Sequence, residues 1–578
     1  MLQISGHPEE TATLPSDVLQ YVQSVLGASD QYGPTTSISY TAVNIIGRPT
    51  NFPTYGEHID SYMLTTHGNW WREAPSFHPE FGLKNVPESK NPPVHDFLAV
   101  EFEHAVVPRM IGIYETFNPG SIQRIWAFTC AKRWVMLWDE PFGANDSDPT
   151  DLTSRLFYPQ IRNIRFHVRV LRLEFNTSDL AYFPALDGIL MVGSRSLSCT
   201  SEAPASCSAL DSAAPVPPPG TINLTQLPNE ILFGIFSFLD IPSLSAVEIV
   251  CQKFNAVARD SRLYRVVNLR PYWMEVDCKR IRWLETRCTG IRKLDLSWCG
   301  MLTDLHARDV IRLLKACGDT ITHLRLDDMG LEFADDEVCC IPTLCPNLRE
   351  VSLRQMTMTL NPALLHFRNL TRLNLARTTV DTECLVDLLP RNPCLQHLNL
   401  SCCMNLAPQA IASTVSVHNR ELVSLNLWKT EFISPSAVRA LQACTKLREL
   451  NIGWTTNGTT SLDGALGDLL KGCPNMETLF LTGFRCLQDA DLACIAEHGL
   501  QLVQLDIMGC ISVTVPMVER VLQRCTKLRF LDCVHCEIPS MYLLEWSVSY
   551  VNVTICNADK FPRGGFPWDN ARRNRPMN

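Results

Sequence analysis

The chain has 578 residues, of which 46% are hydrophobic and 19% are charged, and its formal net charge at pH 7 is -9. One hydrophobic core cannot organise this length, so two to four domains are expected. The negative charge argues against a nucleic-acid binder, and without an apolar run of about 18 residues no membrane span is predicted.

The first residues, MLQISGHPEETATLPSD, are acidic and contain no apolar segment. This composition matches neither a secretory signal nor an arginine-rich transit peptide, so the chain is expected to start in the cytosol. In that compartment the 24 cysteines are expected to be reduced thiols rather than disulfides. Residues 1–30 are expected to form an N-terminal segment outside the first folded domain.

Residues 31–194 are predicted to be all-β. FLAVEF (97–102), RMIGIYET (109–116), IQRIWAFTC (122–130) and RVLRLEF (169–175) are alternating or aromatic-rich, and turn-forming residues separate them. This pattern favours a sandwich. SYTAVNIIGRPTNFPTYGE, FLAVEFEHAVVP and WVMLWDE resemble the discoidin-like, or galactose-binding-like, jelly roll. In other members of that fold, loops at one end bind sugars or phospholipid head groups.

A flexible linker is predicted over residues 195–221, RSLSCTSEAPASCSALDSAAPVPPPGT, which are rich in Ser, Ala and Pro. We expect few contacts to cross this linker. The β domain and the part of the chain that follows the linker should then fold independently.

Three short helices are predicted within residues 222–272. In LPNEILFGIFSFL, apolar residues recur at helical spacing after Pro228, which suits the first turn of a helix. Asp240 is expected to cap a second helix, and a third follows Cys251. About 40 residues bury too little apolar surface to be stable alone, so this unit needs another surface.

The motif Leu-Pro-x-Glu-Ile-Leu, the apolar run to Leu239, and Val250-Cys251 followed by Phe254 resemble the F-box. This resemblance implies docking on a Skp-family adaptor, which connects the chain to a cullin–RING ligase core. A generic helical cap for the region that follows is the alternative. Carried over by position, the adaptor-binding candidates, which face the adaptor or form the bundle, are Leu227, Pro228, Ile231, Leu232, Leu239, Leu244, Val250 and Cys251.

Residues 273–545 repeat one pattern about ten times. The pattern apolar-x-x-apolar-x-apolar runs from IRKLDL at 291 to LRFLDC at 528, with spacings typical of leucine-rich repeats. Each repeat supplies one strand and one helix that cannot bury their apolar faces alone, whereas stacked copies can. An α/β leucine-rich-repeat solenoid is therefore predicted, followed by a C-terminal tail over 546–578.

Polar residues that flank the inner leucines of each strand are expected on the concave face of the solenoid. A face of mixed charge that includes arginine and tryptophan suits protein binding, although it can also be merely solvated. The substrate-binding candidates are Arg325, Arg354, Arg372, Asn374, His397 and Trp428.

No phosphate loop, HExxH motif or dinucleotide-binding glycine motif is present in the sequence. The cysteines follow the repeat instead, which favours structural thiols over zinc ligands or a catalytic nucleophile. Cys288, Cys345, Cys444, Cys473 and Cys525 each lie three residues before the first apolar residue of a repeat. We therefore expect a non-catalytic chain with no metal and no cofactor.

The order of discoidin-like domain, linker, F-box and repeats resembles the F-box/LRR-repeat protein 4 family, and ETFNPG (115–120), NLRPYW (268–273) and LDLSW (294–298) strengthen the resemblance. It implies a substrate-recognition subunit of a Skp–cullin–F-box E3 ubiquitin ligase that restrains mitophagy.

Family members carry an N-terminal mitochondrial address, whereas this chain starts with an acidic segment. Either an upstream stretch is missing or a partner brings the chain from the cytoplasm to the mitochondrial outer surface. The alternative function is a non-ligase scaffold whose β domain binds a glycan or lipid.

Overall fold

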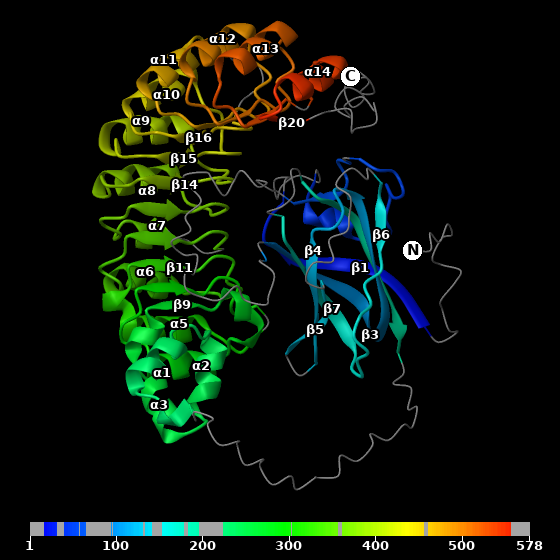
Figure 1. Ribbon diagram of the computed structural model, residues 1–578, viewed down its shortest axis with the longest axis vertical. Helices are drawn as coiled ribbons and strands as arrows, with labels where there is room; N and C mark the ends of the chain where they lie inside the picture. Colours follow the sequence, from blue (N-terminus) through cyan, green and yellow to red (C-terminus); the bar gives the residue numbers. More distant parts are fainter. Residues whose placement is uncertain are drawn as a thin grey trace, which may run out of the picture.

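The computed structural model describes residues 17–31, 40–56, 58–64, 94, 96–130, 133–140, 153–177, 183–195, 224–301, 303–356, 361–455, 461–533 and 535–556. These residues form an N-terminal all-β region, a small F-box-like helical unit and an α/β repeat region (Figure 1). Residues 1–16, 196–221 and 557–578, which belong to the predicted N-terminal segment, linker and tail, lie outside the described residues.

The β region is one eight-stranded antiparallel sheet, in the order β2-β8-β1-β3-β7-β4-β5, with β6 paired to β3. A buried cluster that includes Phe102, Ile113 and Leu171 forms its core. The strands are β1 (Asp17–Ala28), β2 (Tyr62–Met63), β3 (Asp96–Phe117), β4 (Ile122–Phe128), β5 (Trp134–Asp139), β6 (Arg155–Phe157), β7 (Val168–Phe175) and β8 (Ala185–Ser194).

Two details of the β region differ from expectation. The sheet begins at Asp17, so the predicted start at residue 31 is wrong. Apolar residues of β1 recur at helical spacing, and pairing with β3 and β8 overrides that local signal. The predicted strands 97–102 and 109–116 are parts of the single strand β3, which crosses Pro108 through register shifts.

The F-box-like unit consists of α1 (Asn229–Phe236), α2 (Ile241–Glu248) and α3 (Gln252–Ala258). The predicted cap of α2 is confirmed, because Asp240 Oδ1 accepts a hydrogen bond of 2.9 Å from the Ser243 N–H. Leu232, Phe236 and Leu244 lie in a core that continues into the repeat region. The small unit therefore obtains its missing apolar surface from the neighbouring repeats.

The repeat region contains a parallel sheet of twelve strands in chain order. All ten sequence hexads give one strand each, β10 to β19, and β9 and β20 extend the sheet beyond the predicted 273–545 boundaries. The strands are β9 (Val266–Asn268), β10 (Lys293–Asp295), β11 (His323–Arg325), β12 (Glu350–Ser352), β13 (Arg372–Asn374), β14 (His397–Asn399), β15 (Ser424–Asn426), β16 (Glu449–Asn451), β17 (Thr478–Phe480), β18 (Gln504–Asp506), β19 (Phe530–Asp532) and β20 (Thr554–Cys556).

Helices alternate with these strands and lie on the outer side of the curved sheet (Figure 1). Because helices are wider than strands, this stacking bends the array. The α-helices are α4 (Cys278–Glu285), α5 (Ala307–Cys317), α6 (Asp335–Leu344), α7 (Asn361–Leu364), α8 (Thr382–Leu388), α9 (Pro408–His418), α10 (Pro435–Ala440), α11 (Ala465–Gly472), α12 (Asp489–His498), α13 (Val515–Arg524) and α14 (Ser540–Ser549).

A turn with one left-handed residue follows each of the strands β10 to β19, and we call this row the turn ladder. Backbone hydrogen bonds join neighbouring turns, such as Trp298 N–H to Asp327 C=O at 2.9 Å and Asp328 N–H to Arg354 C=O at 3.0 Å. The left-handed residues are Trp298, Asp328, Gln355, Arg377, Cys402, Lys429, Trp454, Gly483, Gly509 and His535. The ladder forms a continuous edge of the repeat region.

Many repeat cysteines are buried and bind main-chain carbonyls of the preceding repeat. The Sγ atom of Cys473 lies 3.2 Å from the Cys444 carbonyl oxygen, and that of Cys536 lies 3.1 Å from the Ile507 carbonyl oxygen. Burial raises the pKa of Cys473 and of Cys536 to about 12. Protonated, buried thiols that close the stack fit the structural role predicted from their spacing.

Candidate protein-interaction surfaces

The structure divides the adaptor-binding candidates into surface and core residues. Ile231 is 52% exposed and Val250 is 63% exposed, whereas Leu232 and Leu244 are each 1% exposed. A side chain inside the bundle cannot contact a partner, so Leu232 and Leu244 are bundle-forming positions rather than adaptor-facing ones. Pro228 is exposed, and Leu227, Leu239 and Cys251 are half-buried.

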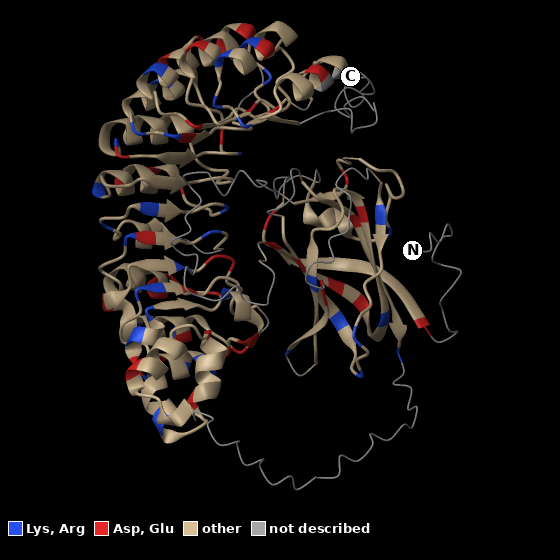
Figure 2. Cartoon of the chain, viewed as in Figure 1, with Lys and Arg blue, Asp and Glu red and all other residues tan. Residues whose placement is uncertain are grey.

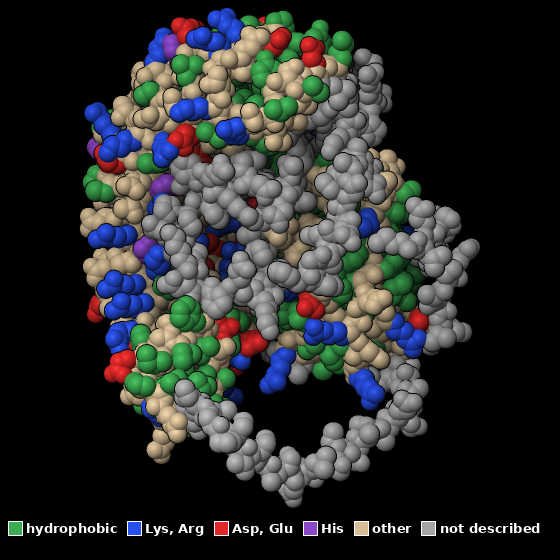
Figure 3. Space-filling view, viewed as in Figure 1, with side chains coloured by type: hydrophobic (Ala, Val, Ile, Leu, Met, Phe, Trp, Pro, Cys, Tyr) green, Lys and Arg blue, Asp and Glu red, His purple; other side chains and the backbone are tan. Residues whose placement is uncertain are grey.

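Three further apolar residues on the surface of the same unit are not among the positions carried over from the F-box motif. Ile235, Phe238 and Ile249 are 41%, 59% and 86% exposed. With Ile231, the first two have the spacing i, i+4, i+7, which places them on one side of α1 and its C-terminal turn. Figure 3 shows hydrophobic side chains gathered over the F-box-like unit at the lower left. We call Ile231, Ile235, Phe238, Ile249 and Val250 the F-box patch.

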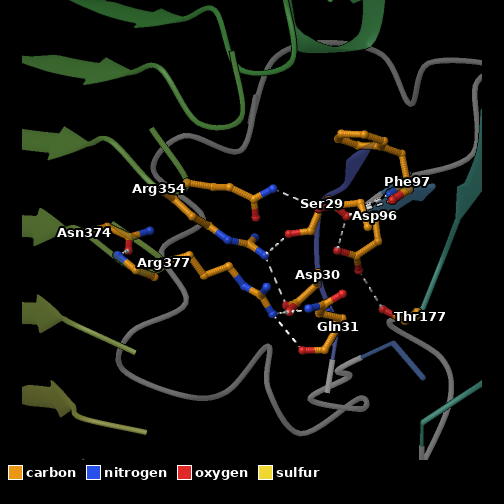
Figure 4. Close-up of polar contacts among 12 residues, drawn as sticks. Ser29, Asp30, Gln31, Asp96, Phe97, Thr177, Arg354, Asn374 and Arg377 are labelled. Carbon is orange, nitrogen blue, oxygen red and sulfur yellow. Dashed lines mark hydrogen bonds and ion pairs between the residues drawn. The ribbon is translucent and has the colours of Figure 1, made fainter. Parts of the chain in front are cut away.

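The substrate candidate Arg354 binds the chain's own β region (Figure 4). Its guanidinium donates to the Ser29 carbonyl oxygen at 2.6 Å and lies 3.1 Å from the Asp30 carboxylate. On the next rung, Arg377 pairs with the same carboxylate and donates to the Gln31 carbonyl oxygen at 2.7 Å. Two guanidinium groups from the turn ladder therefore converge on one carboxylate at the end of β1.

Arg325, Arg372 and His397 come together around the buried carboxylate of Glu350. Arg325 donates to this carboxylate at 2.7 Å, and Arg372 Nε lies 3.8 Å from it. Arg372 Nη2 also lies 2.8 Å from His397 Nε2. Asn374 turns toward its own backbone and accepts a hydrogen bond of 3.1 Å from the Ala376 N–H. These candidates are thus half-buried in contacts within the repeat region.

Trp428 belongs to an apolar cluster that joins the turn ladder to the β region. The cluster contains Phe117 and Ala185 from the β region and Met508 from the repeats, and Trp454 packs against it beside Trp428. The ammonium group of Lys429 lies 4.4 Å from the centre of the Trp428 ring. The structure therefore places Trp428 and Arg354 in domain contacts, apart from the Glu350 cluster.

A third contact between the two regions surrounds Arg172 of β7, near the F-box-like unit. The Arg172 guanidinium lies 3.7 Å from the centre of the Phe97 ring and 3.6 Å from that of the Trp273 ring. It also lies 5.0 Å from the centre of the Trp298 ring. Cations over aromatic faces are attracted by the ring quadrupole, most strongly when water is excluded. We call Arg172 with these three rings the Arg172 cage.

Glu174 balances the charge inside the Arg172 cage. Its carboxylate accepts hydrogen bonds from Arg172 at 3.2 Å and from the Trp273 indole N–H at 2.7 Å, and Arg124 lies 3.5 Å away. Burial lowers the pKa of Arg172 to about 10, and the neighbouring Glu174 opposes this shift. Both side chains are almost completely shielded from water.

The expectation that few contacts connect the β region with the rest of the chain is wrong. The Arg172 cage, the Asp30 ion pairs and the Trp428 cluster all join residues that are far apart in sequence. Trp126 and Trp134 of the β region even share one hydrophobic cluster with the repeats. The composition of a linker describes the linker alone and does not report contacts that its two flanking regions make elsewhere.

A pH-dependent stability is expected from Asp328 in the turn ladder. Burial raises the pKa of its carboxyl group to about 7, and Arg354 only partly opposes this. A carboxyl group whose folded pKa exceeds its unfolded pKa of about 3.9 binds protons more tightly in the folded state. Its contribution to stability is therefore present at acid pH and is lost as the pH rises through about 7.

Asp328→Asn should accordingly raise the melting temperature relative to wild type more at pH 8 than at pH 5. Asparagine tolerates the left-handed backbone at this position, where φ is 52°. Thermal melts of the full chain at both pH values measure the effect, with Asp335→Asn on the exposed first turn of α6 as a control. A difference that is independent of pH would contradict the assignment.

The chain has relatives among known proteins. An F-box-like family model matches residues 224–270. The F-box/LRR-repeat protein 4 of Bos taurus is 30% identical over 531 residues, which cover 85% of this chain and 83% of that protein. A chain of the crystal structure of the Rad7 and Elc1 complex in yeast aligns with a TM-score of 0.38 and 14% identity, over 57% of this chain and 92% of its own length.

Within the described residues, every helix is too short or too polar to span a bilayer. The match to the Bos taurus protein covers 85% of this chain, which is more than any one of the three regions contains, so it extends beyond a single region. The chain belongs to the F-box/LRR-repeat protein 4 family.

Proposed function

We propose that this chain is the substrate-recognition subunit of a Skp–cullin–F-box E3 ubiquitin ligase. The F-box patch is the observation that carries the proposal, because it gathers several large apolar side chains on the surface of one small helical unit. Contiguous exposed apolar surface of this kind indicates a protein-binding site. A Skp-family adaptor is the proposed occupant, and Leu227, Pro228, Leu239 and Cys251 would complete the adaptor-binding surface.

The proposed contribution to ubiquitin transfer is positional. The adaptor would connect the chain to a cullin–RING core, and another subunit would carry the reactive ubiquitin. Holding a substrate protein beside that subunit raises the effective concentration of its lysines. Buried repeat cysteines such as Cys444 and Cys525, whose pKa values burial raises to about 11, support a role without a thiolate nucleophile.

The proposed cellular role is in mitochondrial quality control, with the chain acting from the cytoplasm at the mitochondrial outer surface. Its support is membership of the F-box/LRR-repeat protein 4 family. The substrate protein is proposed to bind the repeat region, as expected from the sequence. Because Arg354 and Trp428 contact the β region, the substrate surface needs residues beyond those two.

Adaptor capture tests this function. Ile231→Ala and Phe238→Ala should each weaken binding to a purified Skp adaptor about tenfold or more, because truncating a central apolar anchor commonly costs at least 1–2 kcal/mol. Val417→Ala on α9 is the matched control, since Val417 is 60% exposed but lies outside the F-box-like unit. Titration of labelled adaptor measures each affinity.

The control should bind like wild type, and the wild-type complex should recruit the cullin–RING core on a sizing column. A chain that captures no Skp adaptor at micromolar concentration would contradict the ligase assignment and favour a scaffold. Equal losses for Val417→Ala and Ile231→Ala would show that the F-box patch is not the docking surface.

A further inference from the structure

Two surfaces of the repeat region are engaged within the chain. The turn ladder contacts the β region through Trp298 in the Arg172 cage, through Arg354 and through Trp428. On the strands, Arg325 and Arg372 surround Glu350. Any charged surface that remains open to a partner must therefore be sought elsewhere on the repeats.

The opposite edge of the parallel sheet, where the strands begin, is such a surface. One residue before each strand stacks on its counterpart in the previous repeat through the backbone. The N–H groups of Arg292, Thr322 and Arg349 donate to the carbonyl oxygens of Arg265, Arg292 and Thr322, each at 2.8 Å. Successive rungs of a sheet lie about 4.8 Å apart. Arg265, Arg292, Thr322 and Arg349 thus form four consecutive rungs of one row.

Three of these four rungs carry an exposed arginine. Arg265, Arg292 and Arg349 make no ion pair or side-chain hydrogen bond with any residue that the structure describes, and we call them the arginine edge. The first of them lies directly beside the F-box-like unit, between η5 (Ser261–Tyr264) and β9. In Figure 3, basic side chains line the left margin of the repeats, away from the β region.

Later rungs of the same row differ. Thr371, Gln396, Val423 and Val503 are uncharged, and Arg448 forms an ion pair with Glu477 on the next rung. The exposed Arg529 stands alone near the C-terminal end of the row. Exposed arginines that form no ion pair with a described residue are therefore most closely spaced on the early rungs, where Arg265 also lies near the Arg262–Asp260 pair. Arg368 and Arg391 add charge on this side, because both precede strands, β13 and β14, and both donate to the Leu365 carbonyl oxygen.

Like charges on neighbouring rungs repel one another and add nothing to folding. They do create a local positive potential on a chain whose net charge is -9, and this potential attracts acidic groups to the edge. Arginine also binds carboxylates with a planar pair of donors. The row spans three rung spacings, or about 14 Å, which matches four to five residues of an extended peptide.

We propose that the arginine edge binds an extended acidic segment of the substrate protein. This inference rests on the proposed function, since it names the chemistry that the receptor would recognise. Its position beside the F-box-like unit would hold the acidic segment close to the adaptor. The row lacks aromatic side chains on its rungs, which a single-stranded nucleic acid would need for base stacking.

The test uses the full chain and a fluorescein-labelled decaglutamate peptide as the probe. Changing Arg265, Arg292 and Arg349 together to alanine should weaken peptide binding at least tenfold in low salt. The control changes Arg439, Lys446 and Arg448 to alanine, which alters the net charge equally but removes residues that are already ion-paired. The control should stay within twofold of wild type.

Adaptor capture is measured on the same three proteins and should be unchanged. If all three proteins capture the adaptor and bind the peptide with equal affinity, the proposal that the arginine edge binds an acidic segment is wrong, whereas the proposed function stands. Loss of adaptor capture by the wild-type chain would overturn the function itself. A labelled oligothymidylate that binds more tightly than the peptide, and loses affinity in the edge variant, would overturn the acidic-peptide assignment in favour of nucleic acid.

Discussion

Deleting residues 1–195 is expected to leave an F-box and repeat fragment that aggregates instead of folding stably. The deletion uncovers side chains that are buried in the full chain, among them Trp273 at 1% exposure, Trp298 at 4% and Met508 at 6%. Tryptophan buries about 150–250 Å² in a folded protein. Together with Trp428 and Trp454, these residues would exceed the few hundred Å² of contiguous apolar surface that soluble monomers normally expose.

The deletion also removes charge partners from the turn ladder. Arg354 and Arg377 lose the Asp30 carboxylate, which, with Asp328, holds the pKa of Arg354 above its usual value despite burial. Of the acidic groups near these two arginines, the deletion removes Asp30 and leaves Asp328, so the like charges on adjacent rungs would be less well balanced. The loss of apolar contacts and the loss of the Asp30 carboxylate both affect the turn ladder. The fragment is therefore expected to be less stable as well as prone to aggregation.

Soluble yield, size-exclusion profile and binding of a hydrophobic dye measure this outcome for the fragment that contains residues 196–578. The matched control expresses residues 1–200 and 201–578 as two separate chains in one cell. Because the contacts do not depend on the linker, these two chains should copurify and restore solubility. A monomeric fragment with the melting temperature of the full chain would contradict the expectation.

The repeats could be predicted from sequence because each copy carries its own signal. In LTRLNL (370) or LQHLNL (395), period-two alternation fixes the strand, and the ten copies reinforce one another. The helix cap at Asp240 could be predicted for the same reason, because it depends only on residues next to it in the sequence. The residues that face the adaptor were harder to predict. Leu232 and Ile235 are both apolar and lie on the same helix, and helical spacing does not show which of them faces the bundle. That choice depends on packing against the repeats.

The domain contacts could not be predicted, because no local pattern encodes them. In RVLRLEF, Arg172 reads as a polar residue of an alternating strand and would normally face water. Its burial requires Trp273 and Trp298, which follow the F-box-like unit more than a hundred positions later. Arg354 was likewise predicted to lie on the concave face and to be available to a substrate. Its partner Asp30 lies in a segment for which no strand was predicted, so nothing in the sequence indicated their ion pair.

Arg172→Met is expected to destabilise the full chain strongly. Methionine retains much of the apolar length of arginine, but it removes the cation from the Arg172 cage and leaves Glu174 buried beside only the Trp273 N–H and Arg124. Removing one partner of a buried ion pair commonly costs about 3–5 kcal/mol. A loss of this size should lower the melting temperature of the domain pair by roughly 5–10 °C.

Arg169→Met on the same strand is the control, because Arg169 pairs with Glu101 at a half-exposed position and such pairs contribute about 1 kcal/mol or less. In the two-chain version, Arg172→Met should abolish copurification and Arg169→Met should preserve it. Equal melting temperatures for Arg172→Met and Arg169→Met would mean that the Arg172 cage does not hold the two regions together.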